Sequence, residues 1–174
     1  MKPLVQKLPL PENVSFVAKT FRTPNFEVGW HQHTEYELIL FTEGSGMSFI
    51  GNHVGEFDTG DIYFLGSDLP HTFQKSGNLV TAAVVVQFRE NFWGEEFLRI
   101  PETKKIKELF QAASQGLKIT GTSKRRLQPL VKQLETENSF SRLLLLGECL
   151  DIIAEKKEYV KVSSQPLKPL NTKD

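Results

Sequence analysis

The sequence predicts a mainly β fold in which a closed or double-layered β core comes first and helices follow. Between residues 15 and 88, short segments rich in aromatic and β-branched residues alternate with turn signals about every ten to twelve residues, as in β sandwiches and barrels. From residue 90 onward, apolar residues recur three and four positions apart among charged ones, which is the period of a helix. A chain of 174 residues can form one such core without a disulfide or a metal to hold it together.

We expect six strands in the first half, at residues 16–21, 36–41, 47–50, 62–65, 71–73 and 79–88. Each ends at a turn signal, of which Gly51-Asn52 and Ser76-Gly77-Asn78 are examples. Glycine and asparagine accept the backbone conformations that tight turns require. The strands therefore follow one another closely enough to form a core that closes on itself or folds into two layers.

The second half predicts a short helix over 103–114 and a return strand over 117–120. A longer helix follows, capped by Thr122 or Ser123, with an apolar face that runs from Leu127 to Leu134. Pro129 lies within this face, and a proline inside a helix removes one backbone donor and clashes with the preceding turn. We therefore expect a kink or a later helix start.

A second long helix begins after a short link at 137–139, where Ser139 is the expected cap. Such short links join helices into antiparallel hairpins. The second helix carries apolar residues on more than one side, from Phe140 to Ile153. The surplus leaves two explanations open: the hairpin covers the open end of the β core, or it forms a homodimer interface over 127–153.

These patterns divide the chain into a β barrel with a short helix at 1–121, a helical hairpin for dimerisation or linking at 122–162, and a polar linker or tail at 163–174. The last segment is too polar and proline-rich to bury a core of its own.

Charge and composition exclude several kinds of protein. The chain has 21 basic and 21 acidic residues, so it lacks the basic excess of a protein that tracks nucleic-acid phosphates. Cys149 is the single cysteine, which excludes an intramolecular disulfide and fits a reducing compartment. No apolar run is long enough for a signal peptide or a membrane span. The expectation is a cytoplasmic protein without membrane contact.

Three of the four histidines stand in one pattern with glutamates. In His31-Gln32-His33-Thr34-Glu35-Tyr36-Glu37, alternate side chains of an extended chain point to the same side, about 7 Å apart. Further along, a turn, a strand and a second turn from Gly60 deliver His71, which we expect opposite the first pair. The pattern therefore gathers imidazole and carboxylate groups on one face.

This set has two interpretations. As a metal site, His31, His33, Glu37 and His71 offer three imidazole nitrogens and one carboxylate oxygen, which suit a divalent ion such as Zn, Fe, Mn or Ni. As a polar cluster without metal, His33, Glu35, Glu37 and His71 bind a small organic ligand. The ligand chemistry permits a metal but does not require one.

The spacing resembles that of the cupins. His31-x-His33, three residues, Glu37, six residues and Gly44 are similar to the first cupin motif, and Gly60 with His71 eleven residues later to the second. The match has gaps, because Asn25, Gly66, Asp68 and Lys75 replace the usual residues at four motif positions. The resemblance implies a double-stranded β-helix, or jelly roll, and places the four candidate ligands at the positions where cupins bind metals.

One branch of cupins is more similar still. The segments Trp30–Leu38, Glu43-Gly44-Ser45-Gly46, Ile50-Gly51-Asn52-His53 and Leu69-Pro70-His71 resemble the N-terminal sensor domain of AraC-type transcriptional regulators. The resemblance extends over about residues 16–163 and implies effector binding in the barrel, dimerisation through the helices, and a C-terminal domain with two helix-turn-helix motifs. That domain is absent here, so we expect this chain to be part of a longer protein that binds DNA only through the missing domain.

Three functions follow as hypotheses. The preferred one is the ligand-sensing and dimerisation domain of an AraC-type regulator, not an enzyme, with a sugar, an aromatic acid or another organic acid as effector. The second is a metal-dependent cupin enzyme, such as a dioxygenase or isomerase. The third is a stand-alone cupin that binds a small molecule without a DNA partner.

Overall fold

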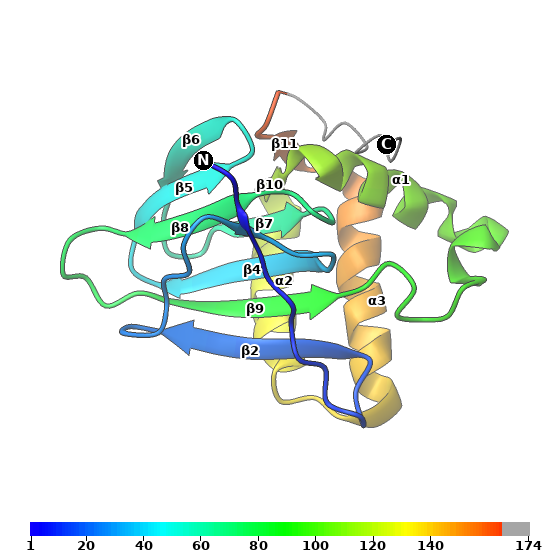
Figure 1. Cartoon of the computed structure of the whole chain (residues 1–174). Coiled ribbons are helices and arrows are strands. Elements are labelled where there is room, and N and C mark those ends of the chain that lie inside the picture. Colours follow the sequence, from blue (N-terminus) through cyan, green and yellow to red (C-terminus); the bar gives the residue numbers. More distant parts are fainter. Residues whose placement is uncertain (165–174) are drawn as a thin grey trace, which may run out of the picture.

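The computed structural model describes residues 1–164, in which eleven strands form two sheets (Figure 1). The five-stranded sheet has the order β1 (Leu4–Val5), β3 (His31–Gln32), β8 (His71–Lys75), β5 (Gly46–Ile50) and β6 (His53–Phe57). The six-stranded sheet has the order β11 (Tyr159–Lys161), β10 (Leu117–Ile119), β7 (Ile62–Leu65), β4 (Tyr36–Glu43), β9 (Ala82–Phe88) and β2 (Phe16–Arg22). All six predicted strands are present, and the mainly β fold of two facing sheets followed by helices is confirmed.

The central strands of the six-stranded sheet, β4, β7 and β9, are buried on both faces. Along β4, Ile39 and Phe41 belong to the apolar cluster between the two sheets. Leu38 and Leu40, which alternate with them, belong to a second cluster shared with the helices. A strand covered on both sides needs a continuous apolar run, which explains the sequence Leu38-Ile39-Leu40-Phe41.

The helices pack on the outer face of that sheet (Figure 1). They are α1 (Lys104–Ala112), α2 (Gly121–Leu134) and α3 (Ser139–Lys156), with short 3-10 turns η1 (Phe97–Arg99), η2 (Pro101–Thr103) and η3 (Ala113–Gln115). The predicted short helix and helical hairpin are thus present. The hairpin buries its main apolar stripe against the sheet, and Phe140 and Leu144 of α3 stay 66% and 54% exposed.

Pro129 does not delay the start of α2, which begins at Gly121. Glu158 explains the early start, since its carboxylate accepts hydrogen bonds from the Ser123 backbone and the Thr122 hydroxyl and so satisfies donors of the first turn. Pro129 is exposed, so water can reach the carbonyl that the proline leaves unpaired. The residue at the cap position of α3 is Asn138, and Ser139 is the first helical residue.

Four short strands were not predicted: β1, β3, β6 and β11. After α3 the chain returns to the sheet as β11, which pairs with β10. Ser163 and Ser164, at the start of the predicted tail, both hydrogen-bond to Asn52 in the turn between β5 and β6. The rest of that tail, 165–174, lies outside the described residues. Within residues 1–164, no helix is long and apolar enough to cross a bilayer.

Candidate functional site

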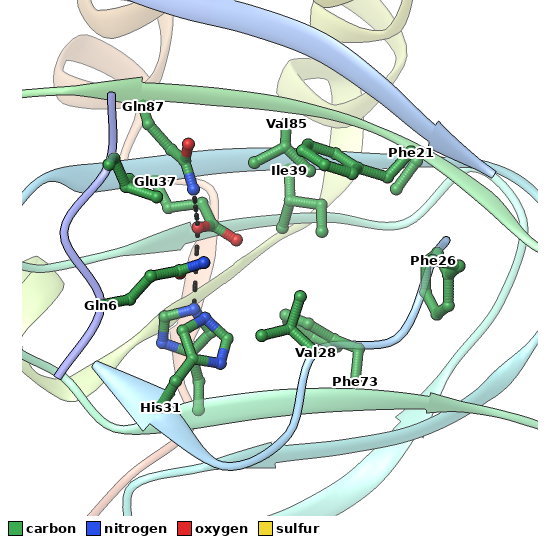
Figure 2. Close-up of a pocket in the computed structure, with 13 residues that line it drawn as sticks. Gln6, Phe21, Phe26, Val28, His31, Glu37, Ile39, Phe73, Val85 and Gln87 are labelled. Atoms are coloured by element: carbon green, nitrogen blue, oxygen red, sulfur yellow. Dashed lines mark hydrogen bonds and ion pairs between the residues drawn. The ribbon is translucent and has the colours of Figure 1, made fainter. Parts of the chain in front are cut away.

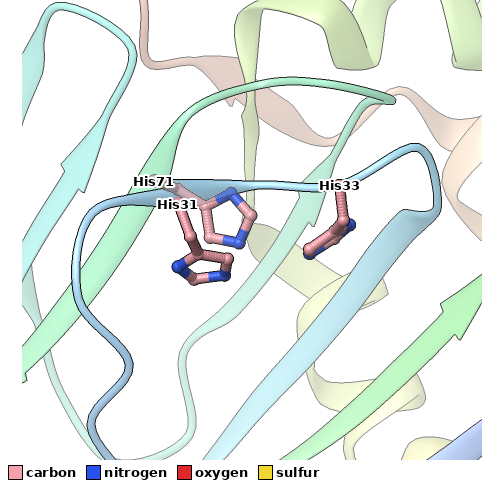
Figure 3. A group of neighbouring side chains, drawn as sticks. All are labelled: His31, His33 and His71. Carbon is pink, nitrogen blue, oxygen red and sulfur yellow. The ribbon is translucent and has the colours of Figure 1, made fainter. Parts of the chain in front are cut away.

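The three histidines come from two neighbouring strands of the five-stranded sheet and from the residues directly after one of them. His31 on β3 and His71 on β8 are direct cross-strand partners, with ring centroids 4.3 Å apart. His33 follows two residues after His31, where β3 has ended. Figure 3 shows the three imidazoles facing one another. One ligand nitrogen from each lies within 4.8 Å of the others, and all three residues are buried.

A hydrogen bond to the backbone orients each imidazole ring in the same way. The Nδ1 atom lies within hydrogen-bond distance of a carbonyl oxygen two residues away: Gly29 for His31 at 2.7 Å, Glu35 for His33 at 3.0 Å and Leu69 for His71 at 2.7 Å. A carbonyl only accepts, so Nδ1 carries the hydrogen in each ring and Nε2 is left for the interior. This orientation by a bond to the other ring nitrogen is the usual arrangement around metal-binding histidines.

Glu37 reaches the cluster from β4, in the opposite sheet. Its Oε2 atom lies 3.0 Å from His33 Nε2 and 3.6 Å from His71 Nε2. Gln87 on β9, the cross-strand partner of Glu37, donates a hydrogen bond of 3.0 Å to the same oxygen. The site therefore joins the two sheets across the interior of the barrel.

The protonation states of Glu37 and His33 follow from their contacts. Burial raises the pKa of Glu37, but the neighbouring His71 and His33 outweigh it and hold the pKa well below its ordinary value. Burial lowers the pKa of His33, but the hydrogen bond to Glu37, the charge of Glu37 and the contacts with Glu35 together outweigh it, so this pKa is raised. For His31, burial and then the nearby His71 lower the pKa. Glu37 is thus a carboxylate that favours a charged His33 beside it.

The donor set fits a divalent metal ion. Nitrogens bound at about 2.1 Å to one tetrahedral ion lie about 3.4 Å apart, so rings already within 4.8 Å need only small rotations. His71 Nε2 is buried and has no hydrogen-bond partner among the described residues. Buried polar atoms normally have a partner, so this nitrogen is suited to bind a ligand. Glu37 Oε2 lies beside two of the nitrogens, close to where a fourth ligand is needed.

A cavity of about 90 Å³ opens beside His31, His71 and Glu37. Figure 2 shows the labelled polar residues, Gln6, His31, Glu37 and Gln87, at one end and the labelled aromatic and aliphatic residues at the other. The polar lining consists of Gln6, His31, Glu37, His71 and Gln87, and the apolar lining of Leu8, Phe21, Phe26, Val28, Ile39, Phe73, Ala83 and Val85. At roughly 10–15 Å³ per water molecule, the cavity has room for several waters or one small organic molecule.

Glu35 and His33 do not line this cavity. Glu35 lies on the other side of His33, with Oε2 3.8 Å from His33 Nδ1 and Oε1 3.6 Å from Arg89 Nε. The structure therefore brings the four candidate metal ligands together. Glu35, a candidate for binding an organic ligand, lies on the side of His33 that faces away from the cavity.

Several lining residues were not predicted. Gln87 had a signal in the sequence, because it is the one polar residue in the run Ala82–Phe88 and alternates with Ala83 and Val85. Gln6 had none: it reaches the cavity because β1 pairs with β3 and the Gln6 backbone donates to the Gln32 carbonyl at 2.8 Å.

Comparisons with known proteins agree with this geometry. The chain matches the family model of the AraC-like ligand binding domain over residues 13–150. No curated protein matches the chain. Among solved structures, ToxT from Vibrio cholerae O395 bound to (E)-4-(8-methylnaphthalen-1-yl)but-3-enoic acid is similar at 14% identity and a TM-score of 0.52, over 90% of this chain and 61% of ToxT.

The AraC-like transcriptional activator CuxR is similar at 11% identity and a TM-score of 0.50, over 76% of this chain and 45% of CuxR. A predicted oxalate decarboxylase from Thermotoga maritima matches at 23% identity and a TM-score of 0.39, over 42% of this chain and 65% of that one. The chain therefore spans less than two thirds of each of these proteins, and at these identities the likeness concerns the fold alone.

Proposed function

Because the chain belongs to the AraC-like ligand-binding family, we propose that it is the sensing domain of a transcriptional regulator and binds a small effector in the cavity between its two sheets. The observation that carries this proposal is the cavity itself, in which the buried Glu37 and His71, whose Nε2 has no hydrogen-bond partner among the described residues, belong to a small polar end of a mostly apolar lining. Ligand sites combine a mostly apolar lining with a few placed polar groups in this way. Such a regulator acts where the DNA is, so we place it in the cytoplasm.

A series of contacts that connects the cavity to residues 163–164 supports the sensing role. His71 pairs with Ile50 on β5, and the Gly51 backbone donates to the Pro70 carbonyl at 2.9 Å. The next residue, Asn52, holds the end of the described chain through its bonds to Ser163 and Ser164. An effector that favours one placement of His71 thereby favours one placement of this segment, which is a population shift.

The ligand test compares two histidine variants. We expect small organic molecules that raise the melting temperature of the wild-type chain to lose that effect in His71→Ala. His53→Ala is the matched control, because His53 starts β6 and does not line the cavity. Equal responses of the two variants would contradict binding at this site. A reading frame that continues past Asp174 into two helix-turn-helix motifs would distinguish the regulator from a stand-alone binding module.

The helical hairpin is our proposed homodimer contact, because Phe140 and Leu144 expose apolar surface on α3 after the rest of the hairpin has packed on the sheet. Light scattering at high micromolar concentration is expected to give a dimer for the wild type and a monomer for Leu144→Glu. A wild-type monomer under these conditions would count against this contact.

A divalent metal, such as Zn, Fe, Mn or Ni, is the cofactor that we propose for His31, His33 and His71, with Glu37 as a neighbouring ligand. When bound, such an ion supplies a Lewis acid that attracts the polar group of an effector. The measurement is elemental analysis of protein purified without chelators, where about one equivalent is expected for the wild type and none for His33→Ala. A metal content near zero in the wild type would refute this part.

The complete histidine set also favours a second candidate, a metal-dependent cupin enzyme such as a dioxygenase or isomerase. Apart from the imidazoles, the acidic or basic side chain that lines the cavity is Glu37, which is already bonded to His33 and Gln87. We therefore propose a sensor without catalytic activity. Substrate turnover by the metal-loaded chain that disappears in His33→Ala would favour the enzyme instead.

A further inference from the structure

We propose that the effector is an amphipathic molecule, with one compact apolar body and a single polar head, and not a sugar. This inference rests on the proposed function, because it assumes that the cavity is the sensing site. It comes from the way in which the strand register separates polar from apolar lining (Figure 2).

The register of β9 against β4 produces this separation. The pair Gln87 and Glu37 is followed, two residues along, by the pair Val85 and Ile39. Another two residues along, Ala83 of β9 pairs with Phe21 of β2. Two residues of an antiparallel strand span about 7 Å. The lining therefore changes from wholly polar to wholly apolar within one such step, and a ligand that fills the cavity spans both parts.

Along β9, the apolar end offers no free backbone hydrogen bonds to a ligand. Val85 and Ala83 lie on β9, which is paired on both sides, with β2 and with β4. The backbone groups there are consequently used within the sheet. A sugar would bury several hydroxyl groups against this surface, and each hydroxyl buried without a partner costs about 1–3 kcal/mol. An apolar ring or branched chain gains free energy from the same burial.

The polar end carries one carboxylate, Glu37, and none of the residues that line the cavity is a Lys or an Arg. His31 and His71 use Nδ1 to donate to backbone carbonyls, so in its neutral form each offers the lone pair of Nε2, and Gln6 adds an amide that can both donate and accept. Glu37 adds a carboxylate, and the Gln87 amide already donates to it. In protein without metal, the head that suits these groups is a hydrogen-bond donor such as an ammonium group. Val28 lines the apolar part of the cavity and is itself 38% exposed.

Benzylamine is the matching probe, and xylose is the contrasting one. On chelator-treated protein, isothermal titration calorimetry is expected to detect benzylamine binding and no xylose binding. Val28→Ser lowers the apolarity of the lining and is expected to weaken benzylamine binding about three- to tenfold. Val54→Ser is the control, because Val54 lies on β6, is 60% exposed and does not line the cavity. Ala83→Leu, which adds three carbons to the cavity, is expected to abolish binding while circular dichroism shows a folded chain.

The outcomes separate this inference from the proposed function. Xylose binding that His71→Ala abolishes, without benzylamine binding, would overturn the amphipathic effector and leave the sensing site in place. Benzylamine binding that is equally strong in Val28→Ser and Ala83→Leu would place the probe elsewhere and overturn the inference. If neither probe binds and no small molecule stabilises the wild type more than His71→Ala, both the inference and the proposed function fail.

Discussion

Replacing Glu37 by glutamine tests the charged pair at the centre of the site. Glu37 Oε2 lies 3.0 Å from His33 Nε2, and both side chains are at most 5% exposed. Removing one partner of a buried ion pair costs about 3–5 kcal/mol, because the other charge stays buried without compensation. Glutamine keeps the volume of the side chain and one carbonyl acceptor. We therefore expect the free energy of unfolding of chelator-treated protein to fall by about 3 kcal/mol, the lower end of this range.

The stabilisation by Glu37 and His33 depends on pH, in opposite directions for the two groups. The pKa of Glu37 is lowered in the folded chain, so its stabilising effect is present above the unfolded pKa of about 4.3 and is lost as the pH falls through the folded value. The pKa of His33 is raised, so its effect is complete below the unfolded pKa of about 6.5 and is lost as the pH rises through the folded value. The pair therefore stabilises the fold most between about pH 4.3 and 6.5.

Urea unfolding at several pH values measures the free energy of unfolding, and NMR titration of the ring protons follows His33. In Glu37→Gln, the maximum at mildly acidic pH is expected to disappear, and the pKa of His33 is expected to fall because burial then acts on it without the carboxylate. A loss below about 1 kcal/mol, or an unchanged titration of His33, would refute the ion-pair reasoning.

Three further substitutions test the parts that hold the site and the helices together. Asn52→Ala removes the bonds to residues 163–164, and we expect amide exchange in that segment to accelerate by roughly tenfold, about one net hydrogen bond; unchanged exchange would show that Asn52 does not hold the segment. Asp61→Asn weakens the 2.7 Å contact to Lys124 of α2 and is expected to cost about 1–2 kcal/mol in urea unfolding, whereas an unaltered midpoint would mean that the contact contributes nothing. Gly66→Ala would place a Cβ 2.7 Å from a backbone oxygen of η3; we expect a loss of about 2 kcal/mol, and full stability would show that η3 shifts freely.

The order of elements was accessible from the sequence because local rules produce it. Turn residues at regular intervals marked the ends of the strands, and helical spacing marked the hairpin. The apolar runs in β4 and β9 also indicate strands buried on both faces, although they do not say what covers each face. The helices provide that second cover, and on α3 Phe140 and Leu144 stay exposed.

Alternation along an extended chain agrees with the placement of His31 and His33, whose rings lie 5.6 Å apart, but fails for Glu35, and Glu37 reaches His33 from the opposite sheet instead. Side chains alternate only while the chain is extended, and here β3 ends at Gln32 and β4 starts at Tyr36. In the bend between them the Glu35 carbonyl turns to accept from His33, and the Glu35 side chain lies behind that ring. The local pattern could not reveal this bend.

The sequence by itself determined which groups are available: three imidazoles and a carboxylate close to strands, within a mainly β chain whose second half forms a helical hairpin. The tertiary structure alone decided what lies in front of them. Gln6, Phe73 and Val85 come from distant segments, and strand pairing brings them to the cavity. Spacing along one strand depends on local backbone geometry, whereas the shape and polarity of a cavity depend on register between strands far apart in the chain.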